Sequence, residues 1–246
     1  MRVRALMYHD VLEGSADVYA VTPAQFRRHL DEIERATGRP PAAVDDVGDG
    51  DWMITFDDGC VSALSVGEEL ARRSWRGHFF IATDQVGTPG SLDWDGVRAV
   101  GEMGHVIGSH SCSHPDRMAD LAPEQLLDEW SRSGAALARE LGAAVATASV
   151  PGGLYSKRVG RAAAEAGYTT LFTSLPSQAP GSIDGCRLIG RYAIRRDTDA
   201  TEAAAAAAGK TVPWARQRAA WDLRGAVKKV AGSRYERMRG ALLARR

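Results

Sequence analysis

The stretch "WMITFDDGC", residues 52–60, places two adjacent carboxylates at the end of an apolar run. Successive side chains of a β-strand point to opposite faces, so Asp57 and Asp58 can serve one place only if the strand stops near Phe56. Gly59 then supplies the permissive backbone of a turn. The stretch therefore predicts a buried strand whose C-terminal end carries both carboxylates, although an ordinary turn rich in Asp and Gly has the same composition.

Apolar runs rich in Val, Ile, Phe or Thr recur along the rest of the chain. They cover residues 3–9, 52–56, 77–83, 105–109, 146–150, 168–174 and 187–194, and helical patterns at 22–37, 61–74, 122–142 and 156–167 lie between most of them. Strand–helix alternation repeated this often indicates an α/β fold with a largely parallel sheet, either a barrel or an open doubly wound sheet. In both architectures the active site lies at the C-terminal ends of the strands.

Length and composition favour a globular intracellular protein. A chain of 246 residues with 44% hydrophobic content suits one large domain or two small ones. No run approaches the roughly 20 apolar residues that cross a bilayer, and "MRVRALMYHDV" lacks a signal peptide's apolar stretch, so we expect a cytoplasmic protein. Three cysteines without CxxC spacing argue against a disulfide framework or a thiolate zinc site.

Charge is divided unevenly along the chain. Residues 210–246 contain eleven Lys or Arg against two acidic residues, a local net charge of +9 in a chain whose total is zero. This division predicts a catalytic domain over residues 1–209 and a basic amphipathic helical tail over 210–246, and it argues against a nucleic-acid-binding protein. The tail either docks on the domain, which we favour, or lies on an anionic membrane, which would place the protein at its inner face.

Polar residues able to bind a metal recur where the predicted strands end. They are His9 and Asp10 after the first run, Asp57 and Asp58 after the second, and His110 and His114 after the fourth. The "HSCSH" segment, residues 110–114, can turn both imidazoles to one point if it coils through about one turn. Two His and one Asp make a three-ligand metal site with positions open for water and substrate, and a second Asp can accept the water's proton.

At this point the chain resembles the polysaccharide deacetylases of carbohydrate esterase family 4, also called the NodB-homology domain. The resemblance spans roughly residues 3–194 and rests on "TFDDG", "HSCSH", the "GHVIGSHSCSHPD" context at 104–116 and "SVPGG" at 149–153. It implies a distorted, incomplete (β/α) barrel, here of about seven parallel strands with surrounding helices. It also implies a hydrolase that removes acetyl groups from sugars with one divalent metal ion, commonly zinc, with Co²⁺, Ni²⁺ or Mn²⁺ as alternatives.

Carried over residue by residue, the resemblance assigns the catalytic roles. It makes Asp57 the general base and makes Asp58, His110 and His114 the metal ligands. A carboxylate on the metal loses basicity, so a neighbour held off the metal must accept the proton. The resemblance also places an oxyanion-stabilising backbone N–H at Gly152, where many relatives carry an aromatic residue.

The chain departs from the common family pattern at two positions. Many relatives have Arg where this chain has Ser149, and many take a general acid from a late His that "RLIGRYAI", residues 187–194, lacks. His9 in "MYHD" instead resembles the N-terminal "YH" acid of a subgroup that includes poly-N-acetylglucosamine deacetylases, which makes His9 the general acid. Asp10 either orients His9 or ends the strand with a turn. Arg191 either replaces the missing Arg beside the catalytic base or lies exposed outside the sheet.

The substrate is less defined than the reaction. Trp94 and Tyr155 are aromatic residues that could stack on a sugar beside Pro151 and Gly153, although packing in the core explains Trp94 equally well. We expect an acetylated cytoplasmic amino sugar, carried as a glycan, on a lipid or on a natural-product scaffold. Two alternatives stay open: a metal-dependent esterase or amidase acting on a non-sugar acyl group, and a non-catalytic carbohydrate-binding relative.

The remaining histidines are expected outside the site. His29 lies among Arg and Glu in a helical pattern, so we expect it at the surface. His78 and His105 precede strand cores at the end opposite to the proposed site, which favours a structural role for both.

Overall fold

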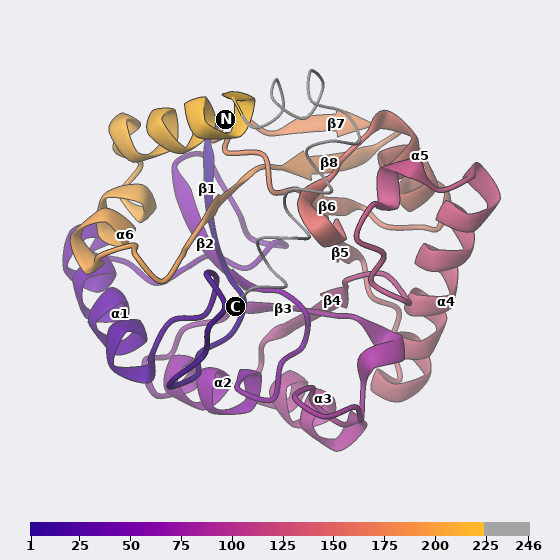
Figure 1. The fold of residues 1–246 in the computed structure, drawn as a ribbon, viewed down its shortest axis with the longest axis horizontal. Coiled ribbons are helices and arrows are strands. Elements are labelled where there is room, and N and C mark those ends of the chain that lie inside the picture. The colour runs from indigo at the N-terminus through magenta and orange to yellow at the C-terminus, as the bar shows by residue number, and fades with distance from the viewer. Residues whose placement is uncertain (224–246) are drawn as a thin grey trace.

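The computed structural model describes residues 1–223, and its centre is a nine-stranded sheet with the order β7-β8-β6-β5-β4-β3-β2-β1-β9. The strands are β1 (Val3–Tyr8), β2 (Asp51–Phe56), β3 (His78–Ile81), β4 (Val106–Ser109), β5 (Thr147–Ser149), β6 (Thr170–Phe172), β7 (Gly181–Ile183), β8 (Cys186–Ile189) and β9 (Arg191–Ala193). The named strands of the described chain pair in parallel, except for the antiparallel β7–β8 hairpin. Figure 1 shows β1 to β6 inside the ring of helices, and β7 at the upper edge of the molecule.

The barrel closes where β8 and β9 follow each other in the chain. β8 pairs with β6, and β9 pairs with β1 at the far end of the sheet. Gly190 lies between them, and a Cβ there would meet the carbonyl oxygens of Leu175 and Ser177 at 2.5 and 2.7 Å. This junction therefore requires glycine. The expected (β/α) barrel is confirmed, but the run 187–194 forms two strands instead of one, and the short antiparallel β7 was not predicted.

Helices surround the sheet (Figure 1). They are α1 (Pro23–Thr37), α2 (Ala63–Arg72), α3 (Trp94–Glu102), α4 (Pro123–Leu141), α5 (Lys157–Glu165) and α6 (Ala200–Ala207). In α1, Thr22 and Gln25 form a capping box, each side chain accepting the other residue's backbone N–H. Pro23 opens the helix, and Gly38 ends it with a φ of 65°. Local sequence signals thus fix both ends of this helix.

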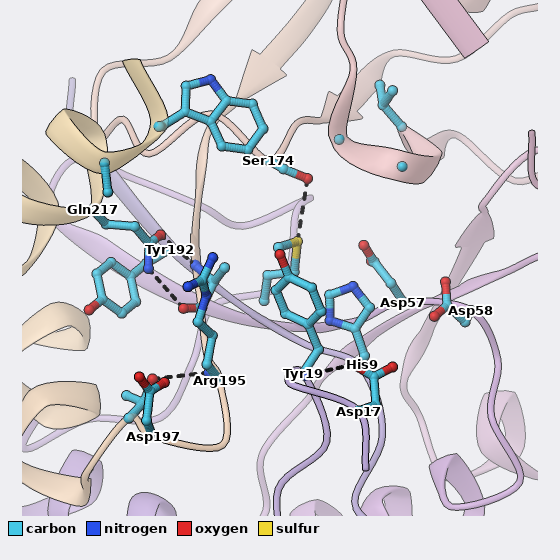
Figure 2. Close-up of a pocket in the computed structure, with 18 of the residues that line it drawn as sticks. His9, Asp17, Tyr19, Asp57, Asp58, Ser174, Tyr192, Arg195, Asp197 and Gln217 are labelled. Atoms are coloured by element: carbon cyan, nitrogen blue, oxygen red, sulfur yellow. Dashed lines mark hydrogen bonds between the residues drawn. The ribbon is translucent and has the colours of Figure 1, made fainter. Parts of the chain in front are cut away.

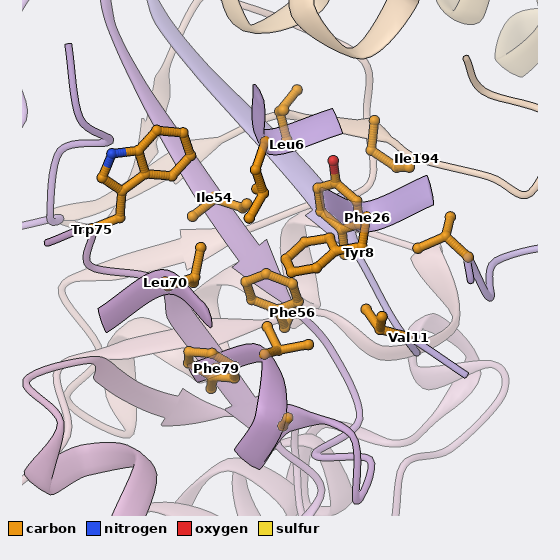
Figure 3. Close-up of a cluster of buried hydrophobic side chains, with 14 of the residues drawn as sticks. Leu6, Tyr8, Val11, Phe26, Ile54, Phe56, Leu70, Trp75, Phe79 and Ile194 are labelled. Atoms are coloured by element: carbon orange, nitrogen blue, oxygen red, sulfur yellow. The ribbon is translucent and has the colours of Figure 1, made fainter. Parts of the chain in front are cut away.

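An aromatic cluster packs the sheet against α1 and α2 (Figure 3). Tyr8 of β1 stacks on Phe56 of β2 with ring centroids 5.5 Å apart, and Phe56 stacks on Phe79 at 4.8 Å. Phe26 of α1 meets Tyr8 edge-on at 5.4 Å. Burial of each such ring contributes about 2–3 kcal/mol. The cluster anchors the last residues of β1 and β2, from which His9 and Asp57 follow.

Three histidines are buried away from the metal-capable residues. His29 is 1% exposed, because the Tyr8 hydroxyl lies 3.2 Å from its Nδ1 and the Thr198 carbonyl oxygen lies 3.1 Å from its Nε2. The expectation of a surface position for His29 was therefore wrong. His78 and His105 are also buried and hydrogen-bonded to the backbone, as structural residues would be.

The first part of the predicted tail packs on the barrel. Residues 211–223 are helical, and Trp214 is buried with its Nε1 donating to the Ala206 carbonyl at 3.0 Å. The Gln217 side-chain amide bonds both backbone groups of Ala193 in β9, at 2.8 and 2.9 Å. The rest of the basic tail, 224–246, lies outside the described residues. Within residues 1–223 no helix has the length and hydropathy of a membrane span.

Candidate active site

Asp57 is held at the end of β2 by an arginine and a serine. Arg191 donates to its two carboxylate oxygens, from Nη1 at 2.6 Å and from Nη2 at 2.8 Å. The Ser149 hydroxyl lies 3.3 Å from both oxygens and accepts from Arg191 Nη2 at 2.7 Å. Burial, the largest single influence, acts to raise the pKa of Asp57, but the Arg191 charge, the neighbouring His110 and the Arg191 hydrogen bonds together outweigh it, so the pKa is lowered and the carboxylate stays ionised. Arg191 is thus the buried partner of Asp57, not an exposed strand residue.

Asp58 reaches the same place because the chain turns sharply after β2. Asp58 and Gly59 both have left-handed backbone conformations, with φ values of 73° and 75°. Asp tolerates this conformation better than most residues with a side chain, and a bulky or β-branched residue would be strained there. The turn lets two consecutive carboxylates face one site, which a continuing strand would forbid.

The loop after β4 brings two imidazoles to Asp58. Nε2 of His110 and Nε2 of His114 each lie 3.2 Å from Asp58 Oδ1. His114 has a φ of 57°, and its backbone N–H donates to the Ser111 hydroxyl at 3.1 Å. Glu129 of α4 accepts two further backbone N–H groups of the loop, at 3.0 and 2.9 Å. The loop is therefore shaped by hydrogen bonds within the protein.

These three side chains fit a divalent metal ion. One ligand atom from each of Asp58, His110 and His114 lies within 4.8 Å of the others. Asp58 Oδ1 is buried and has no hydrogen-bond partner among residues 1–223, although both imidazoles are near it. The His110 Nδ1 bonds the Ser149 carbonyl oxygen at 2.9 Å, which leaves its Nε2 free to coordinate. One carboxylate and two imidazoles are a typical donor set for catalytic zinc.

His9 follows β1 and lies beside the two carboxylates (Figure 2). Burial lowers its pKa, and the negative charges of Asp57 and Asp58 act against that shift. Asp10 does not hold His9: its carboxylate accepts from the Ser62 hydroxyl at 2.5 Å. Of the two alternatives for Asp10, the structure favours a role in fastening the turn.

The "PGG" turn, η3 (Pro151–Gly153), forms the opposite wall. Gly152 has a φ of 62°, and a Cβ at this position would clash with the Asp116 carbonyl oxygen. An aromatic side chain could not fit this backbone. Gly152 and Gly153 line the cavity, whereas Pro151 is buried. The oxyanion role of the Gly152 N–H stays a prediction.

These groups open into one cavity of about 490 Å³ (Figure 2). Its lining includes Tyr19 from the loop after β1 and Trp221 from helix 211–223, neither of which was predicted as a site residue. The two aromatic residues that were predicted lie elsewhere. Trp94 lines a separate hollow beside Cys112, and Tyr155 packs near Gly160. Sequence spacing carried no signal for Tyr19 or Trp221, because tertiary packing alone brings them to the cavity.

A comparison with protein families identifies the chain. The family model for polysaccharide deacetylase matches residues 45–171, more than half of the chain. The chain belongs to the polysaccharide deacetylase family. No curated protein sequence matches it.

Solved structures of deacetylases share the fold of this family member. IcaB from Ammonifex degensii has a TM-score of 0.72 with 22% identity, covering 84% of this chain and 97% of that one. The Streptococcus pyogenes deacetylase PplD, solved with acetate, has a TM-score of 0.68 with 17% identity, covering 81% and 95%. A de-N-acetylase from Aggregatibacter actinomycetemcomitans has a TM-score of 0.69 with 18% identity, covering 80% and 97%.

Family membership makes the chain a hydrolase that acts on acetylated sugars. In this polysaccharide deacetylase the arginine beside the buried Asp57 comes from β9, the strand that pairs with β1.

Proposed function

We propose that this polysaccharide deacetylase is a metal-dependent N-deacetylase of an acetylated amino sugar. Asp58, His110 and His114 would hold one divalent ion, with zinc as the best match to the donor set. When bound, the ion supplies Lewis acidity, which polarises the acetyl carbonyl and makes water more acidic. The observation that carries the proposal is the convergence of this triad with a second carboxylate, Asp57, that is ionised and fastened separately.

Asp57 is the proposed general base. It lies 3.8 Å from Nε2 of His110, so it borders the metal ligands without belonging to their triad. Arg191 keeps it ionised and fixes its plane through two hydrogen bonds. A carboxylate held in this way accepts the proton of the attacking water. The Gly152 backbone N–H would donate to the oxyanion that develops on the acetyl group.

His9 is the proposed general acid. An amide expels a basic amine, so breakage of its C–N bond requires a proton on the nitrogen. His9 lines the cavity together with Asp57 and the triad, and it supplies an imidazole where the late strand β9 offers none. His9→Ala should reduce amide deacetylation by roughly a hundredfold or more, with a much smaller loss on an activated aryl acetate, whose leaving group needs no proton.

The cavity fits a small sugar moiety. Its volume of about 490 Å³ is in the ordinary range for small-molecule sites. Trp221 provides an aromatic face of the kind on which a pyranose ring can stack. That the sugar is part of a glycan, linked to a lipid or borne by a natural product stays a prediction, and so does the cytoplasmic location.

Acetate release from a panel of substrates tests the proposal. The panel contains N-acetylglucosamine and its short oligomers, an O-acetylated xylo-oligosaccharide, acetanilide as a non-sugar amide, and an aryl acetate. We expect release from the N-acetyl sugars, loss of that release after chelation, and its return with zinc. Release from the esters or acetanilide alone would favour the esterase or amidase alternative. Sugar binding without any release would favour a non-catalytic relative.

A further inference from the structure

The acid His9 needs a fixed orientation, and no hydrogen bond at Nδ1 provides it. His9 Nδ1 is buried and has no hydrogen-bond partner in the described chain. Asp10, its neighbour in sequence, is bonded to Ser62 instead. A proton donor whose ring can rotate or tilt transfers its proton poorly, because transfer requires alignment within hydrogen-bond reach.

An aromatic contact takes the place of the missing hydrogen bond. The ring of Tyr19 lies against that of His9, with centroids 4.8 Å apart and planes inclined by 34°. Figure 2 shows Tyr19 beside His9, on the side away from Asp58. A tyrosine has few rotamers, so a ring whose backbone is fixed makes a rigid support.

The loop that carries Tyr19 is fastened to the segment after β9. The backbone N–H of Arg196 donates to the Val18 carbonyl at 2.9 Å, and its Nη2 donates to the carbonyls of Ser15 and Asp17, each at 2.5 Å. The Tyr19 N–H donates to the Asp17 carboxylate at 2.9 Å. The position of the Tyr19 backbone is therefore set from both sides.

Arg195 fixes the ring itself. Its guanidinium lies over the Tyr19 ring, 5.5 Å from the centroid. The Nε of Arg195 is buried, and among residues 1–223 it has no hydrogen-bond partner. The structure thus assigns this guanidinium to the ring, as a cation–π contact. Arg195, Tyr19 and His9 form a continuous column of contacts.

We propose that Tyr19 is a positioning residue for His9 and that Arg195 positions Tyr19. The inference rests on the proposed role of His9 as acid. The column predicts that a planar ring at position 19 is required, while the phenolic hydroxyl is not. It also predicts that removal of the Tyr19 ring lowers activity only because His9 is then misplaced.

The test is a double-mutant cycle with two substrates. Turnover of an N-acetylglucosamine oligomer and of an aryl acetate is measured for wild type, Tyr19→Ala, Tyr19→Phe, His9→Ala and the double variant. We expect Tyr19→Ala to lower the amide-to-ester ratio by about tenfold to a hundredfold, the scale of a misplaced catalytic group. Tyr19→Phe should restore the ratio, and Tyr19→Ala in the His9→Ala background should change it no further.

Arg195→Gln should lower the same ratio by a smaller factor. Arg218→Gln is the matched control, because Arg218 is exposed, pairs with Asp222 at 3.0 Å and does not line the cavity. Equal losses on both substrates, an additive double variant, or a Tyr19→Ala effect confined to the sugar KM would overturn the positioning role. If His9→Ala itself leaves the ratio unchanged, the acid assignment fails instead, so the two failures are distinguishable.

Discussion

Arg191 and Asp57 form a buried ion pair whose partners are far apart in sequence. Removing one partner of such a pair leaves an uncompensated charge and typically costs about 3–5 kcal/mol of stability. The pair therefore links the proposed catalysis to folding: the group that keeps the proposed base ionised also ties β9 to β2. Substitutions at this position must be judged by activity and stability together.

At the residue scale, Asp57→Asn should retain the metal and lose roughly a hundredfold or more in turnover, because the proton acceptor is gone while the ligand triad remains. The variant should also be less stable, since Arg191 loses its counter-charge. Elemental analysis, acetate release and urea unfolding measure the three quantities. A metal-free but folded variant would show that Asp57 and Asp58 have exchanged roles.

His114→Ala should lose most of the bound zinc, because two remaining ligands hold an ion weakly. His105→Gln is the matched control. His105 is buried and bonds the Gly67 carbonyl at 2.9 Å, away from the triad, so its loss should affect stability and not metal content. Full zinc content in His114→Ala would contradict the ligand assignment.

At the scale of elements, two closely packed turns place the residues of the site. Gly190 permits β8 to pass into β9, and thereby delivers Arg191 to the barrel interior. Gly152 lets the turn after β5 pass close to the Asp116 carbonyl. At both glycines an added Cβ would come too close to backbone atoms, and both lie beside residues of the site. A single added methyl group should therefore disturb the fold and the site together.

Gly152→Ala should destabilise the protein by well over about 1 kcal/mol and reduce activity, because it adds a clash with the Asp116 carbonyl to an unfavourable φ of 62°. Gly87→Ala separates the two causes. Gly87 has a φ of 82° with no atom within 4 Å of the added Cβ, so only the backbone strain of about 1 kcal/mol applies. Equal losses of stability in urea unfolding for the two variants would show that the clash adds nothing to the backbone strain.

At the scale of the whole molecule, buried neutral histidines make stability depend on pH. His78 accepts from the Val44 N–H at 3.0 Å and lies 3.3 Å from the Ile54 carbonyl, so its ring is neutral in the fold. Burial lowers its pKa from 6.5 to about 4. The unfolded chain therefore binds a proton at His78 more readily than the folded chain does. The stability that the neutral ring contributes is fully present above pH 6.5 and is lost as the pH falls towards 4.

We expect His78 to account for about 3 kcal/mol of stability lost across that window. Urea unfolding of wild type and His78→Gln at pH 7, 6 and 5 measures it. The variant should be less stable at pH 7 and should show a shallower decline towards pH 5. Parallel declines in the two proteins would show that other groups cause the acid sensitivity.

The sequence predicted the α/β alternation and the strand-end residues because these follow from local rules, whereas the choice of a barrel over an open sheet came from the family resemblance. Strand–helix alternation and metal-capable residues after successive strands are visible without tertiary information. The side of the strand on which Arg191 lies depends on the closure at Gly190, which no local pattern reveals. The strand β7 was not predicted, because three residues are too few to show a strand pattern.

Two other misses have different causes. His29 was predicted at the surface from its charged neighbours, yet it lies on the same helical stripe as Phe26, Leu30 and Ile33, and that spacing could have placed it inside. Tyr19 and Trp221 reach the cavity from segments about 200 residues apart in the chain, so only the folded structure shows them together.

The central claim is that one ion held by Asp58, His110 and His114 supports N-deacetylation with Asp57 as base. The most direct measurement is a titration of chelated protein with zinc, following acetate release from an N-acetylglucosamine oligomer. Activity should rise linearly and level off at about one zinc per chain, while Asp57→Asn takes up the same zinc with little activity. Release that persists after chelation, or that zinc does not restore, would contradict the account.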